Sequence, residues 1–275
     1  MTRGRLAGAI AAAVVAAVVG VVLAGRGGGS PVAAAATKTG QTSAHLTFSL
    51  TAQGPKLGHT LQVSGSGAVD ENGADITVND SGAPAAFPSS FHAIVLQQGG
   101  HELAFVHATP MPAFVGKDWV EVDLSKLASS HGIDLGALAA GGSATTPAQL
   151  LDLLRGAGAT VTDLGPATVG TTSTTHYRVL VDAAEIAKVA DLPSSLVDEL
   201  GKQAAKTVPV DVWIGTDGLV HRVALDLRHG AAHAAFTATL SDYGTAVSIS
   251  PPPSSDVLDV TSFLTGLGGG MRPFS

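Results

Sequence analysis

The sequence predicts an α+β protein in which a large curved antiparallel sheet is covered on its concave face by a few short helices. Three observations support this fold class. Many short segments alternate apolar and polar residues, three short segments have helical periodicity, and aromatic residues make up only 4% of a chain that contains 34 glycines. Alternation with period two indicates strands with one buried face, and period 3.6 indicates amphipathic helices.

The first predicted strand, residues 45–52, alternates strictly and places Leu46, Phe48, Leu50 and Ala52 on one face. The pattern returns at 60–69, where Gly65 and Gly67 face inward and permit bending or the close approach of another group. Further strands are predicted at 74–79, 92–97, 102–108, 118–123, 160–164, 168–181, 209–214, 219–228, 233–242 and 246–250. This gives roughly ten antiparallel strands in one sheet.

Helix signals interrupt the strands. Thr146, Pro147 and Gln149 form a capping pattern, and an apolar stripe of leucines follows until Gly156 ends the helix. A second short helix is predicted to begin at Asp182, a third spans 193–206, and a short final helix is predicted at 256–267.

The N-terminal segment determines the compartment. Arg3 and Arg5 precede the uncharged residues 6–24, which as a helix span roughly 28 Å, close to the hydrocarbon thickness of a bilayer. Two alternatives remain open: an uncleaved signal anchor, or a signal peptide cut near the alanines of 32–36. Both place the body outside the cytoplasmic membrane. Residues 25–41 are predicted to be a flexible tether, 42–267 a single domain and 268–275 a C-terminal tail.

The composition excludes several functions. The net charge is −7, and the first 36 residues hold three arginines and no acid, so the body is more negative still. Nucleic acid is therefore not an expected partner, because its binding requires phosphate neutralisation. The chain has no cysteine, which excludes disulfides, a thiol nucleophile, cysteine zinc sites and a lipidated cysteine.

The same composition predicts an apolar cavity between the sheet and its helices. Few aromatic residues and several inward-facing small residues leave space that three short helices do not fill. The predicted lining residues from the sheet are Phe48, Leu50, Val63, Leu225, Leu227 and Phe236, and those from the helix are Leu150 and Leu154. At about 25 cal/mol per Å² of buried apolar area, an acyl chain in such a cavity gains several kcal/mol.

Six segments carry a resemblance to a known family. They are residues 147–158, 163–165, 170–171, 174–179, 208–214 and 217–223. The Thr-Thr-His-Tyr strand at 174–177 and the Pro-Val-Asp-Val-Trp strand at 209–213 are the most specific of them. Together they resemble the LolA/LprG/LppX-like superfamily of actinobacterial envelope lipoproteins. The resemblance implies a half-open antiparallel β-barrel with an apolar cavity for lipids or acylated molecules. Many members are anchored through a lipidated cysteine, so the anchor of this chain would have to be its apolar N-terminal segment.

Polar residues give no catalytic constellation. His221, His229 and His233 lie on neighbouring strands without helical metal-ligand spacing and are expected to be exposed, so no metal site is predicted. His176 is expected to be a packed strand residue and Asp211 a solvated carboxylate.

Trp119 and Trp213 are expected either to pack or to lie at a ligand mouth. No Gly-x-Ser-x-Gly nucleophile motif is present. No catalytic residue, cofactor or enzymatic activity is therefore predicted.

Two functional hypotheses remain. The first is an extracytoplasmic protein that carries or sequesters lipid in an apolar cavity, with a lipid or acylated small molecule as its ligand and the cytoplasmic membrane as the site of its tether. The second is a ligand-free envelope interaction module with a filled core, whose partner is another envelope protein. The amount of lipid bound discriminates between them. A hydrolase is the least supported alternative.

Overall fold

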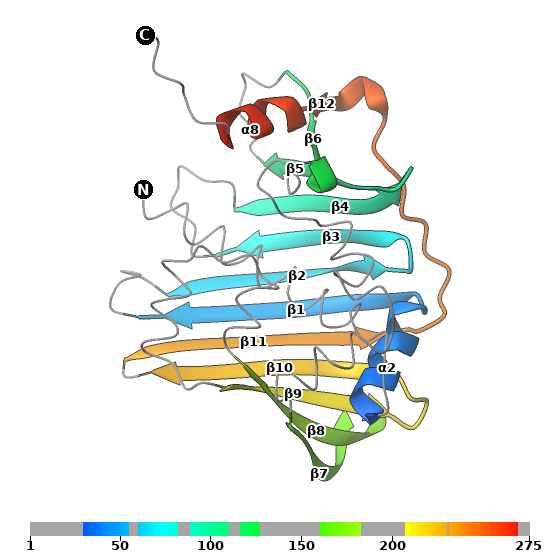
Figure 1. Cartoon of the computed structure of the whole chain (residues 1–275), viewed down its shortest axis with the longest axis vertical. Helices are drawn as coiled ribbons and strands as arrows, with labels where there is room; N and C mark the ends of the chain where they lie inside the picture. The colour runs from blue at the N-terminus through cyan, green and yellow to red at the C-terminus, as the bar shows by residue number, and fades with distance from the viewer. Residues whose placement is uncertain are drawn as a thin grey trace.

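The computed structural model describes residues 30–54, 60–81, 89–109, 116–126, 160–182, 207–229 and 231–268. Twelve strands form one sheet (Figure 1). Their bounds are β1 (Ala44–Gln53), β2 (Leu61–Val69), β3 (Gly73–Asp80), β4 (Ser90–Gln98), β5 (His101–Thr109), β6 (Trp119–Asp123), β7 (Thr160–Val169), β8 (Thr172–Asp182), β9 (Thr207–Gly215), β10 (Val220–His229), β11 (Ala232–Ser241) and β12 (Val257–Asp259).

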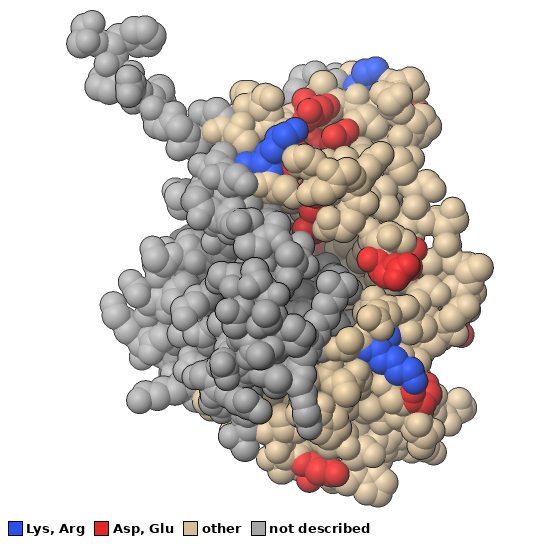
Figure 2. Space-filling model, turned by 45° about the vertical axis from the view of Figure 1, so that its right-hand side comes forward, with Lys and Arg blue, Asp and Glu red and all other residues tan. Residues whose placement is uncertain are grey.

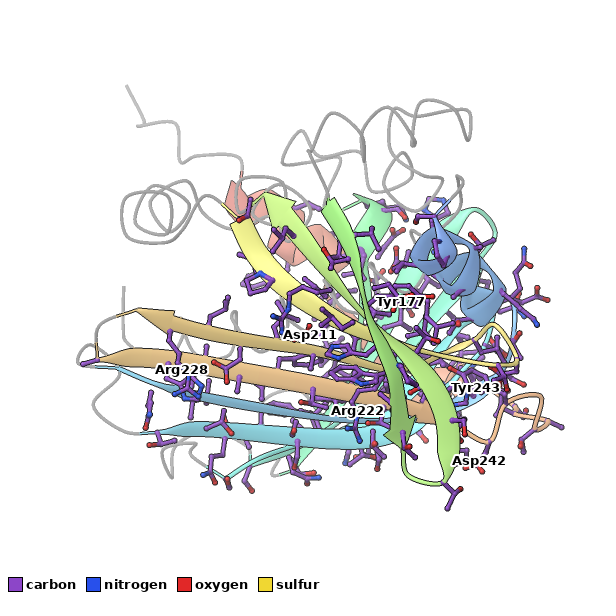
Figure 3. All side chains as sticks on the ribbon, turned by 90° about the horizontal axis from the view of Figure 1, so that it is seen from below. Tyr177, Asp211, Arg222, Arg228, Asp242 and Tyr243 are labelled. Atoms are coloured by element: carbon purple, nitrogen blue, oxygen red, sulfur yellow. The ribbon has the colours of Figure 1, made fainter. Side chains whose placement is uncertain are left out.

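The sheet has the order β12-β6-β5-β4-β3-β2-β1-β11-β10-β9-β8-β7 and is not closed, because β12 and β7 are its two edges. All neighbours are antiparallel except β12 and β6. The helical elements with stated bounds are α2 (Pro31–Gly40), α8 (Thr261–Gly268) and a short 3-10 turn at Ser254–Asp256, and residues 124–126 are also helical. The sheet curves, and β7 and β8 turn away from the plane of β1, β10 and β11 (Figure 3). The predicted fold class, a curved half-open antiparallel sheet with few helices, is confirmed.

The sheet has two chemically different faces. The inner face carries Leu46, Phe48 and Leu50 of β1, and the outer face carries Thr47 and Ser49. Residues opposite one another on paired strands lie on the same face. One buried cluster on the inner face spans β1, β2, β3 and β11. A second, formed by β9, β10 and Ala35 of α2, lies on the same face beside it.

A third buried cluster lies on the outer face. Ile94 and Leu96 of β4 and Phe105 of β5 form it, with Ile249 and Val257 packed against them. The strand pairing shows which face this is. Ile76 lies on the inner face, in the row of Leu46 and Gly67, and it opposes Ala93 of β4. The residue after Ala93, Ile94, therefore points outward. The chain after β11 therefore covers the outer face of β4 and β5.

The N-terminal expectation is wrong for residues 31–40, which form helix α2 instead of a flexible tether. Ser30 caps the helix by accepting a hydrogen bond from the Ala33 amide, and Pro31 begins it. Four alanines then supply the residue with the highest helix propensity. Ala35 and Ala36 are buried, so sheet packing supplies the stability that so short a helix lacks by itself.

Three further strand and helix boundaries differ from the prediction. Residues 168–181 are not one strand, because a turn at Gly170 and Thr171 separates β7 from β8. Residues 246–250 are not a strand: β11 already has neighbours on both sides, so no free edge is available beside it. Residues 256–267 are not one helix but the end of the 3-10 turn, strand β12 and most of α8.

The predicted helices at 146–156, from 182 and at 193–206, and the N-terminal segment 1–24, lie outside the described residues, apart from residue 182, which ends β8. Within the described ranges, no helix combines the length and the apolar character needed to span a membrane.

Candidate functional site

Six of the predicted lining residues lie together on the inner face. Val63, Leu50, Phe236 and Leu225 oppose one another in a single row across β2, β1, β11 and β10. Phe48 lies in the row on one side and Leu227 in the row on the other. Leu150 and Leu154 lie outside the described residues.

The three rows define a patch of twelve residues, here named the apolar patch. Its members are Leu61, Val63 and Gly65 of β2, Phe48, Leu50 and Ala52 of β1, Ala234, Phe236 and Ala238 of β11, and Val223, Leu225 and Leu227 of β10. None carries an ionisable or hydrogen-bonding side chain. The apolar patch can therefore bury apolar groups, but its side chains offer no nucleophile, acid or base.

The large side chains at the centre of the apolar patch are well buried. Phe48, Leu50, Val63 and Phe236 are 4–6% exposed, whereas Leu225 and Leu227 are partly buried. The rings of Phe48 and Phe236 are nearly parallel, with centroids 6.5 Å apart and an interplanar angle of 23°. These contacts place the two largest members of the apolar patch side by side.

Gly65 makes room for one of these rings. A Cβ atom at Gly65 would lie 2.4 Å from two carbons of the Phe48 ring and 2.6 Å from the Thr77 carbonyl oxygen. Both separations are far below van der Waals contact, so only glycine fits beneath Phe48. The close approach predicted for this inward-facing glycine is confirmed.

The outer face of the same strands is chemically different. Thr239, Thr47, Ser66 and Thr77 form one row across β11, β1, β2 and β3. All but Thr239 are exposed. The central strands therefore present hydroxyl groups on one side and aliphatic and aromatic groups on the other.

His176 and Asp211 belong to an outer-face cluster on β8 and β9. The His176 ring stacks on Trp213, with centroids 4.2 Å apart and an angle of 7°. Asp211 accepts two hydrogen bonds from Arg178, at 2.9 and 3.0 Å, and one from His176 at 3.1 Å. Packing was expected for His176 and is confirmed.

The expectation that Asp211 is simply solvated is wrong, since its side chain is only 21% exposed and is fully paired. Burial opposes its ionisation, but the hydrogen bonds and charges of Arg178 and His176 outweigh that effect and hold the pKa of Asp211 below its ordinary value.

The tryptophans also lie on the outer face, opposite to the apolar patch. Trp213 has the Arg222 guanidinium over its ring at 5.7 Å. Trp119 packs against the rings of His92 and His107, with centroid distances of 5.0 and 5.5 Å. Of the two predicted roles, both tryptophans have the packing role in the described structure.

The expectation of exposed histidines is wrong for His221. His221 is 8% exposed, and its Nε2 lies 3.0 Å from an Asp217 carboxylate oxygen. Its ring packs edge-on against the Tyr243 ring, with centroids 5.2 Å apart. His233 is half-buried and lies 3.2 Å from Asp226. The His229 side chain lies outside the described residues. In the described part of the chain, no three metal-ligating residues come together.

A network that the sequence did not predict fixes α2 to the sheet. The Val220 amide donates a hydrogen bond of 2.8 Å to the Thr39 hydroxyl, and Lys38 donates to the Asp217 carbonyl oxygen. Tyr243 donates to the Val220 carbonyl oxygen, and burial raises the pKa of its phenol. The signal that was available is the Ser-Pro cap before the alanine run at 33–36.

The described residues thus define a half-open antiparallel sheet whose inner face carries a charge-free patch. No protein-family model and no curated protein matches the sequence. Solved structures do show similarity. The Mycobacterium tuberculosis lipoprotein LppX is 20% identical, with a TM-score of 0.42 over 78% of this chain and 92% of that one. LprF from Mycobacterium bovis is 16% identical, with a TM-score of 0.38 over 80% and 94%.

A putative outer membrane lipoprotein-sorting protein domain from Vibrio parahaemolyticus is 8% identical, with a TM-score of 0.25 over 77% of this chain and 90% of that domain. At these identities the likeness is one of fold, and the functional inference rests on the inner face itself.

Proposed function

We propose that the protein binds lipid outside the cytoplasmic membrane by burying acyl chains against the apolar patch. The apolar patch is the observation that carries this proposal: twelve adjacent positions on four strands hold no polar side chain. An apolar face is also what a hydrophobic core requires. The proposal adds that part of the space above this face takes a ligand.

The side chains of the apolar patch are suited to an aliphatic ligand. Ala52 and Ala234 are small and oppose one another, in the row beside that of Leu50 and Phe236. In this proposal the methylene chains lie over the small residues, between the larger groups. Each methylene group transferred from water gains about 0.8 kcal/mol, so an acyl chain of ordinary length supplies enough energy for stable yet reversible binding.

The mechanism needs no covalent step. The acyl chain leaves the bilayer or another carrier, desolvates on the apolar patch, and returns when an acceptor offers an equally apolar environment. The N-terminal residues 6–24 support the envelope part of the proposal, because an uncharged segment behind two arginines has the composition of a signal anchor or signal peptide. As an uncleaved anchor it would tether the domain to the membrane.

Lipid extraction tests the proposal directly. Protein purified from a membrane-containing host is denatured in organic solvent and the extract is analysed by mass spectrometry, while the delipidated protein is titrated with a fluorescent fatty acid. We expect lipid in the extract and saturable uptake. Leu227→Gln, which changes a partly buried member of the apolar patch, should weaken uptake, whereas Thr237→Gln on the outer face of β11 should not.

A ligand-free interaction module is the second candidate. The burial of Phe48, Leu50 and Phe236 to 4–6% exposure favours it, because a filled interior covers these side chains with the protein's own residues. This candidate predicts no extracted lipid, no fatty-acid uptake, and a protein partner that is recovered by crosslinking in cells. The absence of both lipid and uptake would overturn the lipid-binding proposal.

A further inference from the structure

We propose that the protein stands on the membrane with its β7 edge toward the bilayer and its β12 edge away from it. This orientation rests on the N-terminal anchor of the proposed function and adds which surface of the domain faces lipid. Three independent observations carry it: the length of the tether, the place where α2 is attached, and the different chemistry of the two sheet edges.

The tether is short because α2 begins so early. The uncharged segment ends at Ala24, and the helix cap is Ser30, which leaves residues 25–29 between them. A fully extended chain spans at most about 3.5 Å per residue, so the helix cap stays within about 20 Å of the membrane end of the anchor. A flexible tether up to residue 41 would have allowed about three times that distance.

Helix α2 is fixed near one edge of the sheet. Ala35 packs in the buried cluster of β9 and β10, and Thr39 accepts the hydrogen bond from the Val220 amide. Tyr177 and Val179 of β8 pack against the same cluster. Among the described strands, only β8 and β7 lie beyond β9 in the sheet, and in Figure 1 α2 lies toward the same end as these strands. The short tether is thereby attached close to the β7 edge.

The opposite edge is far away. Twelve strands spaced about 4.8 Å apart give about 53 Å between β7 and β12 along the sheet. The tether therefore restrains the β7 end and leaves the β12 end free to lie well above the bilayer.

The surface of β7 suits an interface with lipid. Val161 is 36% exposed and Leu164 is 44% exposed, both aliphatic. Val161 opposes Val179, which packs against the cluster that holds α2. Asp163 is the only acidic residue of β7, and its carboxylate accepts a hydrogen bond from the Gly165 amide. Exposed aliphatic groups beside a membrane tether gain free energy by contact with the bilayer interface.

The β12 edge also exposes apolar groups, Leu258 at 36% and Phe263 at 66%, but it is strongly acidic. Its surface acids are Asp118 and Glu121 of the β6 region and Asp256 and Asp259 of the β12 region, against the bases Lys117 and Lys126, while Asp123 is buried. Lys126 is paired with Asp123, at 3.0 Å. Acidic side chains, with basic ones among them, are visible at this end in Figure 2. Anionic lipid repels such an edge.

Fluorescence transfer from single cysteines tests the orientation. The chain has no native cysteine, so Val161→Cys and Leu258→Cys label one edge each, at positions of equal 36% exposure. Each full-length variant, carrying a donor dye, is reconstituted into vesicles of phosphatidylcholine and phosphatidylglycerol that contain an acceptor on the lipid headgroup. We expect transfer from position 161 to be several-fold more efficient than from position 258. Equal transfer, or more transfer from 258, would overturn the orientation.

A lengthened tether is the matched control. Twenty glycine and serine residues inserted after Arg26 should lower transfer from position 161 toward that from position 258, since they leave both edges unchanged. No change would overturn the role of the tether. Flotation of the vesicles separates the two proposals: a chain that does not float with them contradicts the anchor, whereas a chain that floats but shows equal transfer contradicts only the orientation. Fatty-acid uptake is read on the same samples.

Discussion

Strands β1 and β4 belong to the same sheet, yet only β1 alternates cleanly between buried and exposed residues. In β1 every second residue from Ala44 to Ala52 is buried, whereas in β4 most residues are half-buried. The outer face of β1 carries exposed hydroxyl groups, but the outer face of β4 is covered through Ile249 and Val257. Alternation of apolar and polar residues thus indicates a strand that is covered on one face. The alternation weakens where a later part of the chain covers the second face.

Truncation of an aromatic ring on the inner face should produce the largest effect. Phe236→Ala removes the ring of a residue that is 4% exposed and stacks with Phe48. We therefore expect a loss of about 3–5 kcal/mol in the free energy of unfolding. Thr47→Ala, on the exposed face of neighbouring β1, should change it by no more than about 0.5 kcal/mol. Urea unfolding followed by circular dichroism measures both. Similar losses for the two variants would contradict the assignment of the faces.

A side chain at Gly65 should be the next most damaging change. Gly65→Val places new atoms against the Phe48 ring and the Thr77 carbonyl, and overpacking of this kind costs about 1–3 kcal/mol. Ser64→Val, on the exposed face of the same strand, is the control and should be nearly neutral. In a double-mutant cycle, Phe48→Leu should recover part of the loss. A cycle without coupling would show that the ring does not occupy this space.

Loosening the cover of the outer face should have a smaller and more local effect. Ile249 is only half-buried, so Ile249→Ala should cost about 1–2 kcal/mol, less than truncation of a fully buried isoleucine. Hydrogen exchange should quicken in β4 and β5 and remain unchanged in β1 and β2. Ser250→Ala, at an exposed neighbouring position, serves as the control. Faster exchange throughout the sheet would mean that the cover supports the whole fold.

The smallest effect should come from Asp211, whose pKa is lowered in the folded state. A carboxylate whose pKa is lower in the folded state than in the unfolded state stabilises the folded protein at pH values above the unfolded pKa of about 3.9. This stabilisation disappears as the pH falls through the folded pKa. Asp211→Asn should therefore lower stability at pH 7 by roughly 0.2–1 kcal/mol, because the partners are partly exposed. The difference from the native chain should shrink below about pH 4. A difference that grows with acidity would refute the pairing with Arg178.

Sequence patterns predicted the parts of the molecule that depend on local alternation. The buried face of β1, the inward position of Gly65 and the inward position of six members of the apolar patch all follow from period two, because each depends on one strand and one covered face. Helix α2 is not predicted because its alanines form no stripe of large apolar residues, and Ala35 is buried only by packing in the cluster of β9 and β10.

The prediction of a strand at 246–250 is wrong for a different reason. Their alternation is real, but whether they pair depends on which strands flank β11, and no local pattern contains that information. The burial of His221 likewise depends on Tyr243 and Asp217, which only the folded turn brings beside it.

The pairing of β1 with β11 has a consequence for how the chain folds. It joins the earliest strand to one of the last, in the middle of the sheet, so the two halves meet only after residues 232–241 have been synthesised or translocated. Contacts this distant in sequence slow folding. Until they form, β1 and β11 each present a bare edge, and a second nascent copy could bind there in place of the chain's own strand. Delayed pairing of this kind makes strand exchange between copies the characteristic risk of this topology.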